Sequence, residues 1–217
     1  METSGPDADR ISSNDYAALG LKDSRKDNIG NPRILSLLGM LLEKSVQKNE
    51  RLFETSQIKD AITIFHGSRA PAISIQLYID RIFKYSCCSP SCFLIAHIYM
   101  ERFIQRTNFF LTSLNIHRLL VTSVMVAAKF MDDSFFNNAY YARVGGVSTS
   151  EMNKLEKKFL FSLDFRLYVN VNTFGKYCSV FKREGSSGRI ERPIKSCGVE
   201  ESWTNKDDPA HGQSTAR

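Results

Sequence analysis

The four histidines are the first side chains to consider for catalysis or metal binding. They are dispersed along the chain, at His66, His97, His117 and His211. None belongs to an H-E-x-x-H pattern, which would place two zinc-binding imidazoles on one helix face. The chain also contains no Walker phosphate-binding loop, no dinucleotide-binding glycine motif and no nucleophile elbow. We therefore predict that the protein is not an enzyme and has no metal ion or cofactor of its own.

The five cysteines favour a reduced, intracellular protein. Their number is odd, and Cys87, Cys88 and Cys92 lie within six residues of one another, whereas Cys178 and Cys197 are far away. This distribution does not fit a secreted disulfide framework, and zinc would need a second pair of ligands. The sequence shows no apolar signal-peptide core and no run of eighteen apolar residues. We expect mostly buried thiols and a nuclear or cytoplasmic location, or both.

Composition and charge indicate a globular chain without a nucleic-acid partner. Of the 217 residues, 42% are hydrophobic and 24% are charged, which are ordinary values for a folded domain. The net charge of +6 suits an anionic partner, but no groove-reading motif accompanies the spread of basic residues. We expect neither nucleic acid, nor a membrane, nor a small-molecule substrate as a partner.

The N-terminal third is expected to contain one helix. Residues 1–30 are polar with scattered charges, which predicts a disordered arm. Residues 31–73 are predicted to hold a flanking helix, ending near residue 48, and a linker. Asn31 is a suitable N-cap for this helix and Pro32 a suitable first residue. Its apolar face is formed by residues at helical spacing: Leu35, Leu38, Leu42 and Val46.

The strongest helical patterns lie in residues 74–183. Helices are expected at 74–85, 90–106, 115–132, 134–147, 148–164 and 172–182. Ser89 and Pro90 mark one helix start, and Ser148 with Glu151 predicts a capping box at another. The helix at 115–132 is apolar almost all round, so it should be central and buried. The polar residues 184–217 are predicted to be a disordered tail.

Four segments of this region resemble the cyclin box, a five-helix domain. They are SIQLYIDRIFKY (74–85), CSPSCFLIAHIYMERF (88–103), LNIHRLLVTSVMVAAKFMDD (114–133) and STSEMNKLEKKFLFSLDFRL (148–167). The likeness is greatest to plant P-type (U-type) cyclins, which are related to the fungal phosphate-pathway cyclins. The resemblance implies an all-α fold with one cyclin-box domain at 74–183, one flanking N-terminal helix and disordered tails.

The same resemblance implies a regulatory subunit that binds and activates a cyclin-dependent protein kinase, in cell-cycle or nutrient-linked control. Cyclins bind the small lobe of the kinase through a lysine late in the third box helix and a glutamate in the fifth. These positions fall on Lys129 and Glu156. A lysine only donates hydrogen bonds and a carboxylate only accepts them, so together they can satisfy a carbonyl and an amide of a partner. The apolar residues between them fall on Val126, Phe130, Leu160, Phe165 and Leu167.

The resemblance is incomplete at the start of the box. Many cell-cycle cyclins pair an arginine of the first box helix with an acid of the second. The acid position falls on Glu101, but the first helix begins Ala-Ile-Ser-Ile and offers no such arginine. The groove by which some cyclins recruit substrates loses its usual residues in the same helix, so that activity is not predicted. A cyclin-fold scaffold that binds a non-kinase protein is the alternative function.

Overall fold

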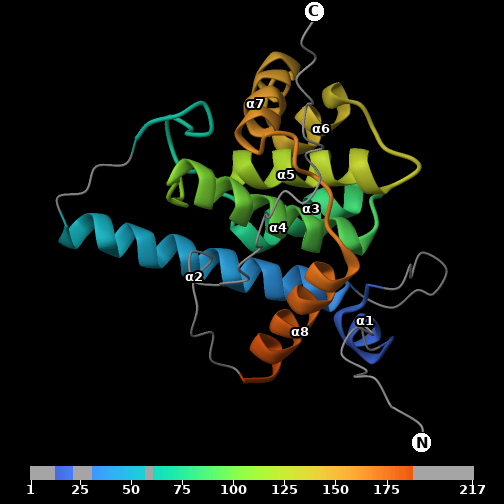
Figure 1. Ribbon diagram of the computed structural model, residues 1–217. Coiled ribbons are helices and arrows are strands. Elements are labelled where there is room, and N and C mark those ends of the chain that lie inside the picture. The colour runs from blue at the N-terminus through green and yellow to red at the C-terminus, as the bar shows by residue number, and fades with distance from the viewer. Residues whose placement is uncertain (1–12, 22–30, 57–60, 188–217) are drawn as a thin grey trace, which may run out of the picture.

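The computed structural model describes residues 13–21, 31–56 and 61–187, and this part of the chain is all-helical, as predicted (Figure 1). Its eight helices are α1 (Ser13–Leu19), α2 (Arg33–Thr55), α3 (Ile75–Ser86), α4 (Pro90–Thr107), α5 (Ile116–Met131), α6 (Asn138–Gly145), α7 (Thr149–Ser162) and α8 (Val171–Ser187). Helices α4 and α5 lie side by side in the middle. Helices α6 and α7 pack on one side of them, and α2, α8 and α1 lie on the other.

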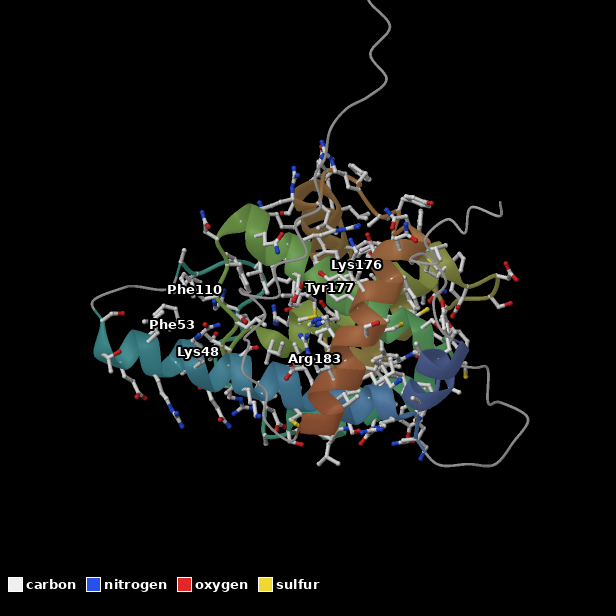
Figure 2. All side chains as sticks on the ribbon, turned by 60° about the horizontal axis from the view of Figure 1, so that its bottom comes forward. Lys48, Phe53, Phe110, Lys176, Tyr177 and Arg183 are labelled. Carbon is white, nitrogen blue, oxygen red and sulfur yellow. The ribbon has the colours of Figure 1, made fainter. Side chains whose placement is uncertain are left out.

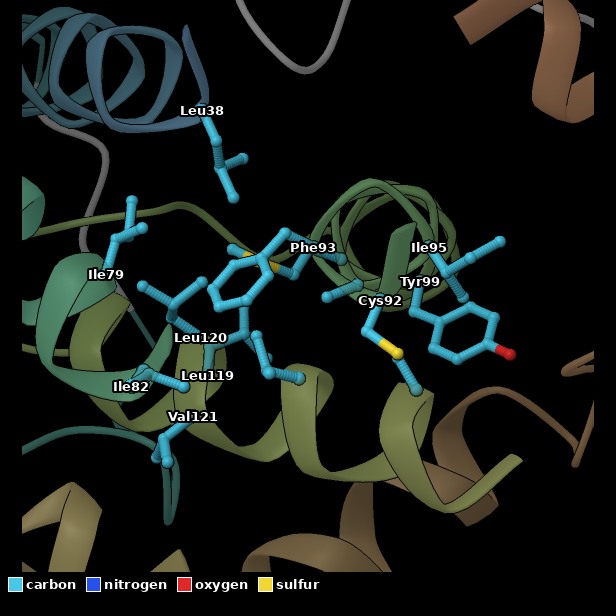
Figure 3. Packing of buried hydrophobic residues seen from close by; sticks show 14 of the residues in the cluster. Leu38, Ile79, Ile82, Cys92, Phe93, Ile95, Tyr99, Leu119, Leu120 and Val121 are labelled. Carbon is cyan, nitrogen blue, oxygen red and sulfur yellow. The ribbon is translucent and has the colours of Figure 1, made fainter. Parts of the chain in front are cut away.

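Helix α5 is the buried centre of the fold, which confirms the expectation from its apolar sequence. Every residue from Leu119 to Ala128 is buried. Figure 3 shows Leu119 and Leu120 among side chains of α3 and α4, such as Ile79, Ile82 and Phe93. Burial of each large aliphatic or aromatic side chain contributes about 1.5–3 kcal/mol. The stability of the domain therefore depends mainly on the layer between α4 and α5.

Ser89 begins α4 as predicted, but its side chain does not cap the helix. Its hydroxyl donates to Oδ1 of Asp132 at 2.8 Å, and its backbone N–H donates to Oδ2 at 2.8 Å. Asp132 directly follows α5. One carboxylate thus ties the start of α4 to the end of α5, close to Lys129.

The predicted capping box at the start of α7 is present. The Ser148 hydroxyl accepts from the Glu151 N–H at 3.1 Å, and the Glu151 carboxylate accepts from the Ser148 N–H at 3.0 Å. The Ser148 N–H and the Ser148 hydroxyl both donate to the same Glu151 carboxylate oxygen, and these two bonds hold the pKa of the Glu151 carboxyl below its usual value. The box fixes where α7 starts, and so where Glu156 lies along it.

We predict that Ser148→Ala lowers the unfolding free energy by about 1 kcal/mol, the usual effect of losing an N-cap. Because the folded-state pKa of Glu151 is depressed, its contribution is present above the unfolded pKa and is lost as pH falls through the folded value. Urea unfolding at neutral and acidic pH measures both effects. The exposed Ser150 of the same helix provides the control, Ser150→Ala. Equal losses in the two variants would contradict the prediction.

Residues 13–21 correct the expectation of a fully disordered N-terminal arm. Ser13–Leu19 forms α1, whose Tyr16 stacks on Phe174 of α8 with the ring centroids 5.6 Å apart. Leu19 and Leu21 are buried. These few apolar residues gain packing partners only when α8 and α2 are in place, and local composition does not report such long-range contacts. The remaining residues of the predicted arm lie outside the described part.

The start of α2 also differs from prediction. Pro32, rather than Asn31, occupies the N-cap position, and no side chain caps the helix there. Asn31 instead donates from Nδ2 to Asp80 Oδ1 of α3 at 3.1 Å. A tertiary contact has replaced the local capping role that the residue type suggested.

Helix α2 continues to Thr55 rather than ending near residue 48. The loop before α5 supports this extension, because Asn49 donates to the Leu111 carbonyl at 2.9 Å. Phe53 meets Phe110 edge to face, with the ring centroids 5.3 Å apart. Figure 2 labels both residues near the C-terminal end of α2. At the other end of the chain, α8 reaches Ser187, beyond the predicted start of the tail at residue 184. Residues 188–217 lie outside the described part.

Candidate functional site

Lys129 and Glu156, named from the sequence as a pair, lie together at the surface. Lys129 is in the last turn of α5 and Glu156 is in the middle of α7. The Lys129 Nζ lies 2.6 Å from Glu156 Oε1, and the side chains are 26% and 19% exposed. The two charges are therefore partly shielded from water but still accessible to a partner.

Asn138, the first residue of α6, completes this pair. Its Oδ1 accepts a hydrogen bond from Lys129 Nζ, and its Nδ2 donates to Glu156 Oε2 at 2.6 Å. The same Nδ2 donates to Asn153 Oδ1 at 2.7 Å. Sequence reasoning missed both asparagines. No periodicity or spacing marks Asn138, because its position depends on the path of the loop from α5 to α6.

The apolar residues named from the sequence fall into two groups. Phe130 and Phe165 are about half exposed, at 50% and 56%. Phe130 directly follows Lys129 on α5, and Phe165 lies in the turn after α7. Leu160 and Leu167 are partly buried and pack against the core. Val126 is only 2% exposed, so in this chain it lies beneath the surface rather than on it.

Two further apolar side chains of α5 and α7 are exposed. Phe161 is 61% exposed and meets Phe165 edge to face at 5.2 Å, and Met131 at the end of α5 is 47% exposed. Phe161 lies outside the apolar stripe of its helix, which is formed by Met152, Leu155, Phe159 and Leu163. A search for the stripe alone therefore overlooks it. A large apolar residue off the stripe is the signal that could have found it.

Helix α4 holds the segment that carries Phe165. Asp164 and Phe165 both have left-handed backbone conformations, with φ of 55° and 54°. For residues other than glycine this costs about 1–2 kcal/mol each. Three hydrogen bonds to carbonyl groups retain the segment: Arg102 Nη1 to Arg166 (2.9 Å), Arg102 Nη1 to Tyr168 (3.1 Å) and the Tyr99 hydroxyl to Leu167 (2.7 Å). The turn is thus held in one strained shape that leaves Phe165 exposed.

Glu101 finds its partners on α8 and α4. It is 1% exposed, and the Tyr177 hydroxyl donates to its Oε2 at 2.5 Å. His97, one helical turn earlier, places Nε2 3.4 Å from the other carboxylate oxygen. The Tyr177 hydroxyl of α8 therefore bonds the Glu101 carboxylate, whereas the start of α3 offers no arginine to pair with it. This site joins α8 to the core and has no direct contact with Lys129 or Glu156.

The described histidines have structural surroundings. The ring of His97 packs edge to face on Phe181 with centroids 4.9 Å apart. His66 Nε2 is 3.0 Å from the Asn115 amide, and His117 Nε2 is 3.0 Å from the Ile73 carbonyl. Burial lowers the pKa of His117. Within residues 13–21, 31–56 and 61–187, no three histidine, cysteine or acidic side chains gather to hold a metal ion.

The described cysteines are mostly buried, as expected. Cys88, Cys92 and Cys178 are buried thiols, and Cys87 is exposed at the end of α3. Cys197, like His211, lies outside the described residues. The Lys129–Glu156 pair offers a hydrogen-bond donor and an acceptor, and Phe130, the residue after Lys129, is exposed; this combination suits binding to another protein.

Comparison with known proteins identifies the class to which this fold and surface belong. The Cyclin family model matches residues 12–167, and the chain belongs to the cyclin family. It is 58% identical over 182 residues to Cyclin-P3-1 of Oryza sativa subsp. japonica, covering 83% of this chain and 77% of that protein. It is 46% identical over 221 residues to Cyclin-U3-1 of Arabidopsis thaliana, with 100% of both chains covered. Cyclin-U4-1 of Arabidopsis thaliana is 49% identical over 153 residues, which are 70% of this chain and 76% of that one.

These relatives confirm the resemblance to plant P-type and U-type cyclins. The role of the chain is that of a cyclin-type regulatory protein, and cyclins are not enzymes, so that prediction is confirmed as well. The usual partner in this family is a cyclin-dependent kinase. The family match begins at residue 12 and therefore includes α1 and α2. Among the described helices, none combines the length and apolar character needed to cross a membrane.

Proposed function

We propose that this chain is the regulatory subunit of a cyclin-dependent protein kinase and activates it by binding its small lobe around the C-helix. The observation that carries the proposal is the accessible Lys129–Glu156 pair, which joins α5 to α7, with the exposed Phe130 directly after Lys129 in the sequence. We place the protein inside the cell, in the nucleus, the cytoplasm or both, in cell-cycle or nutrient-linked control.

The pair has the chemistry to recognise backbone groups of a partner. The Lys129 ammonium can donate to a carbonyl and the Glu156 carboxylate can accept from an amide. Charge-assisted hydrogen bonds of this kind are worth about 1.5–3 kcal/mol each. Phe130 and Phe165 would cover these bonds and exclude water from them. Val126, Leu160 and Leu167 would form the apolar floor beneath.

Activation in this proposal is conformational, because the regulatory subunit performs no chemistry. Binding would favour one position of the kinase C-helix, and that position completes the Lys–Glu pair of the kinase and orders its activation segment. Magnesium and ATP would bind to the kinase. The regulatory subunit contributes only the free energy by which it prefers the active arrangement.

Co-purification with a panel of cyclin-dependent kinases tests the proposal. One or more kinases should bind the wild type, and Lys129→Ala/Glu156→Ala should lose at least about nine-tenths of that binding, because two charge-assisted bonds disappear. The control is Lys176→Ala/Glu54→Ala, two exposed residues on α8 and α2. If no kinase binds the wild type, the function falls to the alternative, a cyclin-fold scaffold for a non-kinase protein. If a kinase binds both variants equally well, the proposed contact residues are wrong.

A further inference from the structure

We propose that Asn138 is the positioning residue of this site: its side-chain amide holds Lys129 and Glu156 in the geometry that receives the kinase. The inference rests on the proposed function, because it concerns how that same site is prepared. It begins from three contacts of one amide group, with the ammonium of Lys129, the carboxylate of Glu156 and the side chain of Asn153.

The chemistry of the amide matches the two charges in one orientation only. Its oxygen can only accept, so it must face the ammonium of Lys129, and its NH₂ group can only donate, so it must face the carboxylate of Glu156. Asn153 takes the second N–H of this group through Oδ1 at 2.7 Å. A carboxylate at position 138 would instead repel Glu156, and an alanine would contact neither charge.

The amide leaves the pair able to bind something else. Of the three N–H bonds of Lys129, the described contacts use two, with Asn138 and Glu156. Each oxygen of Glu156 accepts one hydrogen bond and has capacity for another. Two long, flexible side chains are thus ordered before the partner arrives, which removes part of the entropy that binding would otherwise lose.

The position of Asn138 is set by helices away from the Lys129–Glu156 pair. It follows Asn137, whose side chain caps α6 by accepting from the Tyr140 N–H at 3.0 Å. Tyr140 in turn donates to the Tyr85 carbonyl of α3 at 2.8 Å. The other end of α6 is held by the Tyr78 hydroxyl, which donates to the Gly145 carbonyl at 2.9 Å. Helix α3 therefore anchors α6 at both ends, and α6 delivers the amide to the charged pair.

Calorimetric titration with a kinase that co-purifies with the wild type measures the effect of Asn138. We expect Asn138→Ala to weaken binding about tenfold, and Asn138→Asp to weaken it at least as much. Asn153→Ala, which removes only the contact outside the charged pair, should have a smaller effect. Unchanged affinity of folded Asn138→Ala would overturn the proposal even if the variant is less stable, because the residue would then be structural only.

A swapped variant separates positioning from folding. In Asn138→Asp/Glu156→Gln, the new carboxylate can accept from the new amide, and Lys129 still faces two acceptors. We expect its melting temperature to return towards the wild-type value while kinase binding stays weak, since the carboxylate has left position 156. Recovery of full kinase affinity in the swap would show that the arrangement at Glu156 is not what the kinase requires, and would overturn the proposal.

Nuclear magnetic resonance of the unbound chain tests, without any kinase, whether the Asn138 amide is held between Lys129 and Glu156. The side-chain NH₂ signals of Asn138 should exchange slowly with water in the wild type and quickly in Glu156→Ala, and those of the exposed Asn172 should exchange quickly in both. Fast exchange of the Asn138 NH₂ group in the wild type would overturn the proposal that this amide holds Lys129 and Glu156 in place. A protected amide in a chain that binds no kinase would instead contradict the proposed kinase-binding function and not the positioning by Asn138.

Discussion

Replacing Glu156 with lysine should reduce kinase affinity about a thousandfold, equal to about 4 kcal/mol of binding free energy. The substitution removes the only carboxylate of the proposed contact and places a second ammonium beside Lys129, whose Nζ is now 2.6 Å from the Glu156 oxygen. The amide of Asn138 makes the mismatch worse, because its Nδ2 donor would face another donor. Titration of the purified variant with the kinase found by co-purification measures the loss.

Two further variants make this prediction discriminating. Glu54→Lys, at an exposed position of α2, changes the net charge equally and should leave affinity within about twofold. The exchange Lys129→Glu/Glu156→Lys restores an ion pair and the original net charge but reverses donor and acceptor. We expect it to regain thermal stability and not kinase binding. Full binding by the exchanged variant would show that the pair matters for folding alone.

The helical core could be predicted because its signals are local in the sequence. The segment Leu119–Ala128 is apolar on almost every side of its helix, which predicts a buried helix whatever packs around it. Ser148 and Glu151 meet within one helical turn, so their capping box follows from spacing alone. Lys129 and Glu156 were named from resemblance, because taken alone each is an ordinary surface residue of a helix.

The features that could not be predicted depend on contacts between distant segments. Asn31 has the side chain of an N-cap but bonds to Asp80 of α3 instead. Tyr16 makes sense only against Phe174, far along the chain. Asn138 matters because a loop returns it to Lys129 and Glu156, and neither composition nor periodicity reports that return. Phe65 belongs to the same group, since the short apolar run Ile62–Phe65 lies in an irregular linker and does not reveal which of its residues is buried.

Phe65 should be the most costly linker residue to truncate: Phe65→Ala should lower the unfolding free energy by about 3–5 kcal/mol. Although it lies outside any helix, it is 0% exposed. Its ring meets three others edge to face, with centroid distances of 5.1 Å to Phe103, 6.1 Å to Phe109 and 6.5 Å to Phe159. Alanine would leave a cavity where α4 and α7 meet the linker.

Urea unfolding of Phe65→Ala beside Ile62→Ala tests this directly, because Ile62 comes from the same linker and is 89% exposed. The urea midpoint should fall strongly for Phe65→Ala. For Ile62→Ala, the unfolding free energy should fall by less than about 0.5 kcal/mol. Phe159 lies on α7 one turn beyond Glu156, so the linker supports the helix that carries the charged pair without touching the pair itself. The folded fraction of Phe65→Ala should therefore bind the kinase with near wild-type affinity. Losses of similar size in the two variants would mean that the aromatic cluster contributes little, and that α7 is held in place by its packing on α5 and α6.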